Sequence, residues 1–353
     1  MAKYDAGLAI RDLFLCGVLG FQTHRDRFAI SETKTEIASR LNDMADDFLT
    51  DDEFHRKHGT KDNRDWSLAK QRQLARTGAD SETTITKCLY RPFDVRWCDL
   101  SYRMMDYPRT EIVQNVLNKE NLCLLAPRQL AKAGYQHILV TDLPAESCAI
   151  SLTTKEQNQV LPLYLYPDEQ DRRVNFDPKL WKQLQAKATH PTHGIPDEMQ
   201  TFDYIYGVLH CPAYRDTYAE FLKIDFPRIP WPATPDAFWD IAEKGNVLRK
   251  LHLMDPAAVG KAPYPFKGEG DGMVDKPELK DGHVWINETQ YFADIPPVSW
   301  EFYIGGYQPA QKWLKDRKGR ALSFDDVRHY QSILKILSET DRIMQTIEMT
   351  FEA

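Results

Sequence analysis

The residues with the most distinctive chemistry lie in one basic stretch, residues 305–320, which reads GGYQPAQKWLKDRKGR. Only Asp316 opposes its cations, although the chain as a whole has a formal net charge of -7. Arginine and lysine can hold phosphates or the guanine edge, and glutamine can pair with adenine. The stretch therefore predicts a surface that faces nucleic acid, and the alternative is a solvated helix face with Trp313 buried. Its candidate contact residues are Tyr307, Gln308, Gln311, Lys312, Lys315, Arg317, Lys318 and Arg320.

Other candidate contacts lie in loops and at strand ends earlier in the chain, where a rigid sheet usually presents its working residues. For Arg91 and Arg96, the alternative is an ion-pair network around Asp94 that holds the edge of a sheet together. For the loop at residues 20–26, the alternative is that Thr23 only caps a turn. The full set of earlier candidates is Thr23, Arg25, Arg91, Arg96, Arg103, Arg128 and Gln129.

The chain alternates between helix and strand patterns, which predicts an α+β fold. We expect an N-terminal helical arm over residues 1–82, solvent-facing after residue 50 because that part is highly charged. Residues 83–167 predict a β-rich subdomain with a central mixed β-sheet, and residues 168–258 predict a helical subdomain with a hairpin of two helices. Residues 259–353 predict a small second β element, the basic stretch and C-terminal helices.

Individual elements follow from hydrophobic periodicity and from helix-start signals. Two final helices are expected to begin at Ser323 and Thr340. The expected strands cover residues 83–90, 121–126, 136–141, 149–153, 160–166, 283–287, 290–293 and 299–304.

Composition sets limits on the class of protein. The chain has 353 residues, of which 42% are hydrophobic and 27% charged, as in a soluble globular protein. No stretch approaches the roughly 18 uncharged apolar residues of a membrane span, so we expect neither a membrane segment nor a signal peptide. The six cysteines lie far apart, with no C-x-x-C pair, which favours reduced thiols in the cytoplasm. The acidic balance still allows a basic groove on an acidic body.

Complete catalytic motifs are absent from the sequence. Residues 266–270 (FKGEG) match a glycine pattern that holds the methionine part of S-adenosylmethionine, but no buried strand precedes them. Asp271 and Glu278 could belong to a metal nuclease, although Pro277 would break the strand that such sites occupy. No phosphate-binding loop of the type G-x-x-x-x-G-K-[ST] occurs. We therefore expect no catalysis by this chain alone.

Five segments in order resemble the C-terminal specificity, or target-recognition, region of type ISP restriction–modification enzymes and related single-chain restriction enzymes with adenine methyltransferase activity. The matching segments are residues 20–26 (GFQTHRD), 89–96 (LYRPFDVR), 202–209 (FDYIYGVL), 226–230 (FPRIP), and 304–309 (IGGYQP) with 312–315 (KWLK). Because they extend over nearly the whole chain, the resemblance covers all of the expected subdomains.

This resemblance implies sequence-specific binding of double-stranded DNA in a phage-defence system, with the DNA held for a methyltransferase domain that flips an adenine. It implies that this chain is the recognition part following such a domain, with S-adenosylmethionine bound there and no cofactor here. Thr23 and Arg25 would lie near the methyltransferase junction, and Arg91, Arg96 and residues 307–320 would face DNA. Two alternatives remain: a catalytic DNA-modifying enzyme that uses residues 266–270 or Asp271 and Glu278, and a protein-interaction module that never touches DNA.

Overall fold

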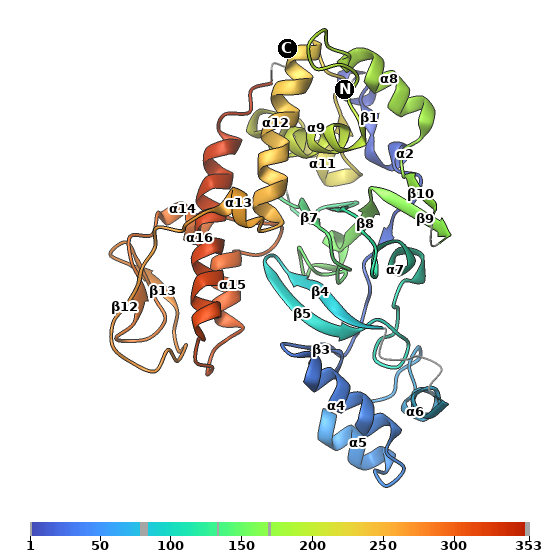
Figure 1. The fold of residues 1–353 in the computed structure, drawn as a ribbon, viewed down its shortest axis with the longest axis vertical. Helices are drawn as coiled ribbons and strands as arrows, with labels where there is room; N and C mark the ends of the chain where they lie inside the picture. Colours follow the sequence, from blue (N-terminus) through green and yellow to red (C-terminus); the bar gives the residue numbers. More distant parts are fainter. Residues whose placement is uncertain (1, 78–83, 133, 169–170, 350–353) are drawn as a thin grey trace.

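The computed structural model of the chain describes residues 2–77, 84–132, 134–168 and 171–349. Its helices and small sheets confirm the predicted α+β class. Figure 1 shows a helical body at the top, sheets in the centre, an arm below them and a C-terminal lobe to the left. None of the helices in these described ranges is long and apolar enough to cross a membrane.

The arm is formed by three helices below the central sheets (Figure 1). It has a core of its own, because Phe28, Phe54 and Trp66 are almost fully buried against one another. The prediction that the arm faces solvent after residue 50 is therefore wrong for the apolar side chains of the arm. These side chains are few, but they are large and pack together in one core. The helices are α4 (Lys34–Ala45), α5 (Asp51–His58) and α6 (Leu68–Thr77), and a short α3 (Asp26–Ala29) precedes them.

Two separate antiparallel sheets stand where one mixed sheet was predicted. The first has the order β3-β5-β4 and the second β2-β8-β6-β7. All of the named strand pairs in them are antiparallel. A short turn joins β4 to β5, whereas β2 pairs with β8 and β3 with β5 across long stretches of sequence. Their bounds are β2 (Val18–Leu19), β3 (Ile30–Ser31), β4 (Ile85–Arg91), β5 (Asp94–Asp99), β6 (Cys123–Pro127), β7 (Leu139–Thr141) and β8 (Asn158–Pro162).

The strand predictions in this region are mostly confirmed, with two exceptions. Residue 83, where the first strand was expected to begin, lies outside the described residues. Residues 149–153 form no strand, because Ile150 instead accepts a hydrogen bond at its carbonyl from the backbone of Gly306. Pro92 and Phe93 form the turn between β4 and β5, and the φ of Phe93, 61°, is left-handed, so the two strands make a hairpin.

The helical body is built on one close helix pair. Helix α9 (Glu198–His210) crosses α12 (Pro235–His252), and glycines lie at the contact. A Cβ on Gly245 would lie 1.9 Å from the carbonyl oxygen of Asp203, so only glycine permits this approach. The predicted hairpin partner of α9, residues 212–224, instead forms two short helices. The other elements here are α8 (Pro178–Ala188), α10 (Pro212–Thr217), α11 (Ala219–Ile224), β9 (Tyr164–Asp168), β10 (Asp171–Val174) and β11 (Arg228–Ile229).

The beginning of the chain belongs to this body and not to the arm. Strand β1 (Leu8–Ala9) pairs with β11 through Leu8 and Ile229. Strand β2 joins the second sheet, and β3 joins the first. Strand pairing thus crosses the boundary expected at residue 82. The division of the chain into four consecutive subdomains, residues 1–82, 83–167, 168–258 and 259–353, remains a proposal. The short helices α1 (Ala2–Asp5), α2 (Ile10–Leu13) and α7 (Thr110–Val116) complete this part.

The C-terminal lobe contains a small antiparallel sheet of order β12-β15-β14-β13 and four helices among its described residues. Of residues 299–304, predicted to be a strand, the first three belong to a helix, because Pro297 at its first turn is preset for helical φ. The break predicted at Thr340 is also absent. The elements are α13 (Pro256–Val259), β12 (Phe266–Lys267), β13 (Glu278–Lys280), β14 (His283–Trp285), β15 (Tyr291–Phe292), α14 (Pro297–Glu301), α15 (Pro309–Lys315) and α16 (Phe324–Met344).

Candidate nucleic-acid interface

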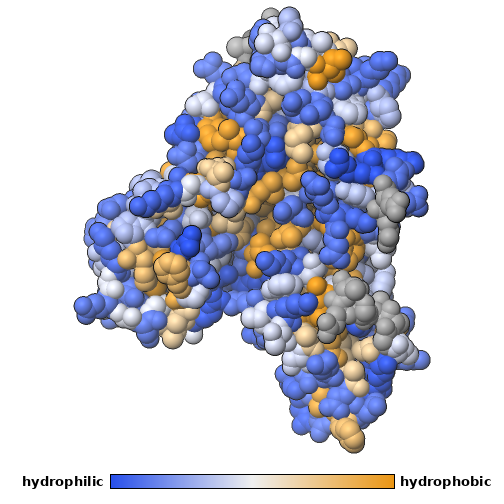
Figure 2. All heavy atoms as spheres, viewed as in Figure 1, coloured by the Kyte–Doolittle hydropathy of each residue, from blue (hydrophilic) through white to orange (hydrophobic). Residues whose placement is uncertain are grey.

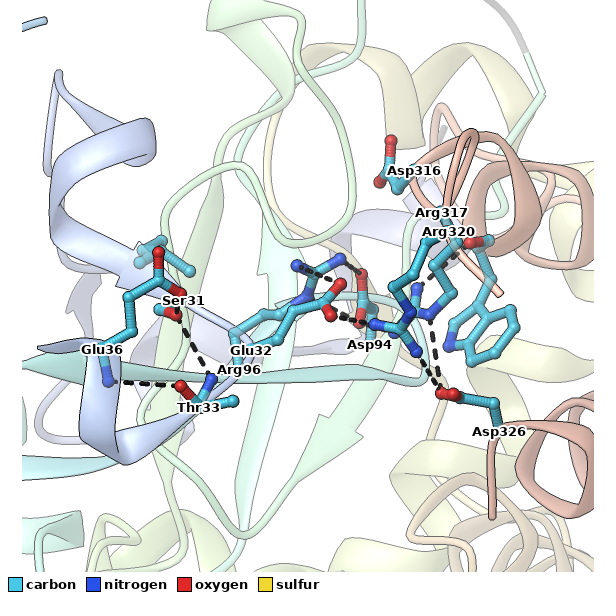
Figure 3. Close-up of polar contacts among 12 residues, drawn as sticks. Ser31, Glu32, Thr33, Glu36, Asp94, Arg96, Asp316, Arg317, Arg320 and Asp326 are labelled. Atoms are coloured by element: carbon cyan, nitrogen blue, oxygen red, sulfur yellow. Dashed lines mark hydrogen bonds and ion pairs between the residues drawn. The ribbon is translucent and has the colours of Figure 1, made fainter. Parts of the chain in front are cut away.

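A buried carboxylate joins two of the predicted contact segments. Asp94, at the start of β5, accepts hydrogen bonds from Arg96 Nε and Nη2, each at 2.9 Å, and from Arg317 Nη2 at 2.9 Å (Figure 3). Burial alone would raise the pKa of Asp94, but the two guanidinium groups outweigh burial and lower it. The ion-pair network considered for Arg96 is therefore present, and it extends to the basic stretch.

The outer part of this network is open to water. Glu32, just after β3, forms an ion pair with Arg96 Nη1 at 3.1 Å through one oxygen and accepts a hydrogen bond from Arg320 through the other. Arg320 also donates to Asp326, at 2.5 Å, in the capping box that begins α16. Figure 3 shows Glu32 lying between the two arginines. Carboxylates from the arm side and from α16 thus hold two arginines at one surface.

These residues line a groove of about 480 Å³ between the β4–β5 hairpin and the C-terminal lobe. Figure 2 shows a notch between the lobe and the arm on the face in view. The charged side chains of the lining balance, since four cations (Lys87, Arg96, Arg317, Arg320) face four carboxylates (Glu32, Asp94, Asp325, Asp326). His329 also lines the groove, and burial lowers its pKa, so its ring is neutral near pH 7.

A second junction joins β4 to the glycine entry of the basic stretch. Arg91 Nη1 donates to Glu146 at 2.7 Å, and its guanidinium lies 3.8 Å from the centre of the Tyr90 ring and 5.6 Å from that of Tyr307. The Tyr307 hydroxyl donates to the carbonyl of Cys148 at 3.0 Å. Arg91 and Tyr307 are both more than nine-tenths buried, so in this structure they brace the junction and do not reach the surface.

Helix α15 presents lysines to solvent and buries its aromatic side. Trp313 packs on Tyr330 and lies 3.6 Å below the Arg317 guanidinium. Lys315 and Lys318 are exposed, and Lys318 pairs loosely with Asp275 at 3.6 Å. Three further predicted side chains are tied locally: Lys312 pairs with Asp316, Gln308 donates to the carbonyl of Glu301, and Gln311 donates to that of Trp300.

Arg128 and Gln129 lie elsewhere on the surface. Both are exposed in the loop after β6, and Arg128 Nε donates to Asp225, beside α11, at 3.1 Å. Among the described residues, neither side chain has a hydrogen bond or ion pair with residues 305–320. Glu156 fixes the start of this loop by accepting from the backbone of Ala131 at 2.9 Å.

The remaining candidates are buried near the arm. Arg25 donates to Asp106 at 2.5 Å and lies 4.1 Å above the Trp66 ring, and the Thr23 hydroxyl donates to Asp26. Arg103 is held by Asp99, with Nη2 at 2.9 Å and Nε at 3.1 Å from its oxygens. These contacts fix the loop at residues 20–26 and the end of the first sheet.

Sequence reasoning missed the importance of Glu32 and Lys87. Lys87 is an exposed position on β4, opposite Trp97 in the antiparallel pairing. The signal available in the sequence was a lysine next to apolar strand residues, which indicates an outward-facing position. Glu32 carried no signal, because a single acid before a helix usually belongs to a cap. Asp326 completes the capping box of the helix that was expected to begin at Ser323.

The motif considered for S-adenosylmethionine is a packed turn. A Cβ on Gly268 would lie 1.9 Å from the carbonyl oxygen of Thr289, and one on Gly270 would lie 2.5 Å from the side chain of Gln290. Its glycines therefore permit close packing within the small sheet and leave no room there for a ligand. Within residues 2–349, apart from the undescribed gaps, no group of three or more His, Cys, Asp or Glu side chains could hold a metal ion.

Comparison with known families gives the class of this protein. The family model described as the type ISP C-terminal specificity domain matches residues 12–346, so the chain belongs to that family. None of the curated proteins matches the sequence.

Three solved structures have a similar fold. The chain aligns with the type ISP restriction–modification enzyme LlaBIII bound to DNA at a TM-score of 0.76 and 16% identity, covering 99% of this chain and 25% of that one. The DrdV–DNA complex gives a TM-score of 0.75 at 20% identity, covering 96% of this chain and 36% of that one. A nuclease-deletion mutant of the type ISP enzyme LlaGI, in complex with a DNA substrate mimic, gives a TM-score of 0.70 at 20% identity. The alignment covers 98% of this chain and 34% of that one. The chain therefore spans about a quarter to a third of the length of these proteins.

Proposed function

We propose that this chain recognises a specific sequence in double-stranded DNA, as the target-recognition part of a restriction–modification enzyme. The observation that supports the proposal is the family match over residues 12–346, together with a shared fold in three proteins whose structures were solved with DNA or a DNA mimic. The shared region makes up only part of each of those proteins, as expected for a recognition part that works beside other domains.

The exposed members of the predicted set are the proposed DNA contacts. Lys315 and Lys318 on the C-terminal lobe hold phosphates, as does Arg128 in the loop after β6, and Gln129 is available to a base edge. Arg96 and Arg320 reach the groove between the two sides. The partly exposed side chains Gln308, Gln311 and Lys312 complete the surface of α15.

The buried members of the predicted set position this surface. Arg317 and Asp94 hold the end of α15 against β5, and Arg91 with Tyr307 holds its beginning. Thr23, Arg25 and Arg103 fix the arm and the sheet in the same way. A rigid support of this kind lets a few exposed side chains keep one register along the DNA.

The other parts of the proposed enzyme complete the reaction. A methyltransferase domain bound to S-adenosylmethionine would act on an adenine while this chain holds the target, and the system would work in the cytoplasm against phage DNA. No catalytic step is proposed for this chain itself.

Fluorescence anisotropy with a random-sequence duplex at several salt concentrations tests DNA binding and its surface. Replacing Lys315 and Lys318 by alanine is expected to weaken binding roughly tenfold at low salt and to reduce the salt slope by about two. The matched control replaces Lys179 and Lys182, two exposed lysines on α8, and removes the same charge from the helical body. Equal losses in the two variants would assign the effect to net charge and would reject the α15 surface.

A further inference from the structure

The strongest feature not yet assigned is the bridge that Glu32 makes between Arg96 and Arg320. Each of its two oxygens faces a different guanidinium, at Nη1 in both cases. A carboxylate with one oxygen on each of two arginines occupies the space that a phosphate group would take between them, because both anions offer oxygens to the same N–H donors.

Both arginines are oriented without the help of Glu32. Arg96 uses Nε and Nη2 for Asp94, which is 2% exposed, and so leaves Nη1 free to point outward. Arg320 uses Nη2 for Asp326, which the cap of α16 fixes in turn. Removing Glu32 would therefore leave two preorganised donors facing one point in the groove.

Glu32 itself is weakly held. A third of its side chain and of that of Arg320 is exposed, and an ion pair open to water is easily exchanged. Two more donors in the groove, Trp313 Nε1 and Arg317 Nε, have no hydrogen bond within the described part of the chain, although both residues are more than nine-tenths buried. Arg317 Nε has only an ion pair with Asp326, at 4.0 Å. Unsatisfied buried donors in a lined groove indicate that an acceptor-rich group belongs there.

The charge of the groove supports the same conclusion. With Glu32 in place, the four cations and four carboxylates of the lining cancel. When Glu32 turns away, the lining has a net charge of +1, and one of its four cations, Lys87, is exposed to an entering anion. The neutral ring of His329 does not change this balance.

We propose that the groove between β5 and α15–α16 binds a backbone phosphate of DNA between Arg96 and Arg320, and that Glu32 occupies this phosphate site when DNA is absent. The proposal rests on the DNA-binding function proposed above and names one site within it. Entry of DNA exchanges a carboxylate for a phosphate without new buried charge. The exchange also frees the segment after β3, which connects the arm to the groove.

The test measures binding of a random-sequence duplex to the full chain across a range of salt concentrations. Glu32→Gln is expected to tighten binding several-fold at low salt, because the phosphate no longer competes with a carboxylate. Arg320→Ala is expected to weaken binding roughly tenfold and to reduce the salt slope by about one. In the double variant the gain from Glu32→Gln should disappear, because one of the two donors is missing.

Matched controls come from an ion pair of the same kind on the far end of α16. Glu339 pairs with Arg342 at 2.8 Å, so Glu339→Gln and Arg342→Ala make the same charge changes away from the groove. They are expected to leave affinity nearly unchanged. Glu32→Asp provides a second variant that keeps the charge but is too short to reach both arginines, and it is expected to tighten binding as well.

Each other outcome overturns a stated part of the account. If the wild-type chain binds duplex DNA but Glu32→Gln and Glu32→Asp leave binding unchanged or weaken it, Glu32 is a structural tie and the phosphate site is rejected. Effects of equal size from the Glu339 and Arg342 controls would also reject it. If the wild-type chain binds no duplex at any salt concentration, the DNA-binding function itself fails.

Discussion

Asp94 and Arg317 form a buried ion pair at 2.9 Å across 223 residues of sequence. The pair joins the β4–β5 hairpin to the end of α15, and Arg96 completes it from the hairpin side. Two segments that each predict DNA contacts are thereby fixed to each other. The position of the basic helix relative to the central sheets depends on this contact.

The Asp94–Arg317 pair should be costly to break. Asp94→Asn leaves Arg96 and Arg317 without their buried partner, and we expect a loss of about 3–5 kcal/mol in the free energy of unfolding. Urea unfolding followed by circular dichroism measures it. The control Asp275→Asn removes an exposed partner of Lys318 and should cost less than about 1 kcal/mol. Equal losses in the two variants would contradict the bracing role of Asp94.

As the pH falls, the helical body should lose stability at a higher pH than the Asp94 network does. Burial lowers the pKa of His252 to about 3, whereas an unfolded histidine titrates near about 6.5. The neutral ring accordingly contributes stability above about pH 6.5, and this contribution is lost as the pH falls toward 3. The lowered pKa of Asp94 acts only below about pH 4, where the unfolded carboxyl becomes protonated.

The variant His252→Gln separates these two effects. His252 accepts from or donates to Tyr206 and Thr340, which a glutamine amide can partly replace. Thermal melts at pH 7 and pH 5 should show a clear drop in Tm for the wild type and a smaller drop for the variant. The same drop in both proteins would show that other groups cause the acid sensitivity.

The crossing of α9 and α12 should tolerate no side chain at Gly245. Gly245→Ala forces a methyl group against the backbone of Asp203, and we expect a loss of about 3 kcal/mol. Gly282→Ala serves for comparison, because Gly282 has a left-handed φ of 75° but open space around it, so only backbone strain of about 1–2 kcal/mol is expected. A Gly245 variant as stable as the Gly282 variant would mean that the helices can move apart.

The loop with Arg128 and Gln129 should depend on Glu156. Glu156 accepts hydrogen bonds from Ser151 at 2.7 Å and from the backbone of Ala131 at 2.9 Å. Glu156→Ala should increase amide hydrogen exchange at residues 128–132 while the core strand β6 stays protected. Unchanged exchange in the loop would remove Glu156 from the set of positioning residues.

Local patterns in the sequence were sufficient to predict the first strand of the β4–β5 hairpin, the basic stretch and the α+β class, but not the second strand of the hairpin, Asp94–Asp99. They also offered the Asp94 network as one of two possibilities for Arg96, but they could not supply its partner Arg317. Pairing across 223 residues is decided by how the parts pack, and no local pattern records it. The same limit explains Glu32, which acquires its role only through two distant arginines.

Two local signals in the C-terminal lobe were overridden, one by a tertiary contact and one by a neighbouring proline. Thr340 reads as a helix start, yet α16 continues through it because its buried hydroxyl bonds to the carbonyl of Ile336 and to His252. Residues 299–304 alternate like a strand, yet Pro297 begins α14 there. At Thr340 the distant partner is His252, which the neighbouring sequence does not contain, whereas at Pro297 one local signal outweighs another.

The central claim is sequence-specific recognition of duplex DNA, and selection from a randomised duplex library tests it most directly. The full chain would be incubated with the library at low and at physiological salt, and the retained DNA sequenced. We predict enrichment of one short motif that persists at the higher salt and is lost when Lys315, Lys318, Arg96 and Arg320 are replaced by alanine. Retention of all sequences in equal proportion at both salt concentrations would contradict the account.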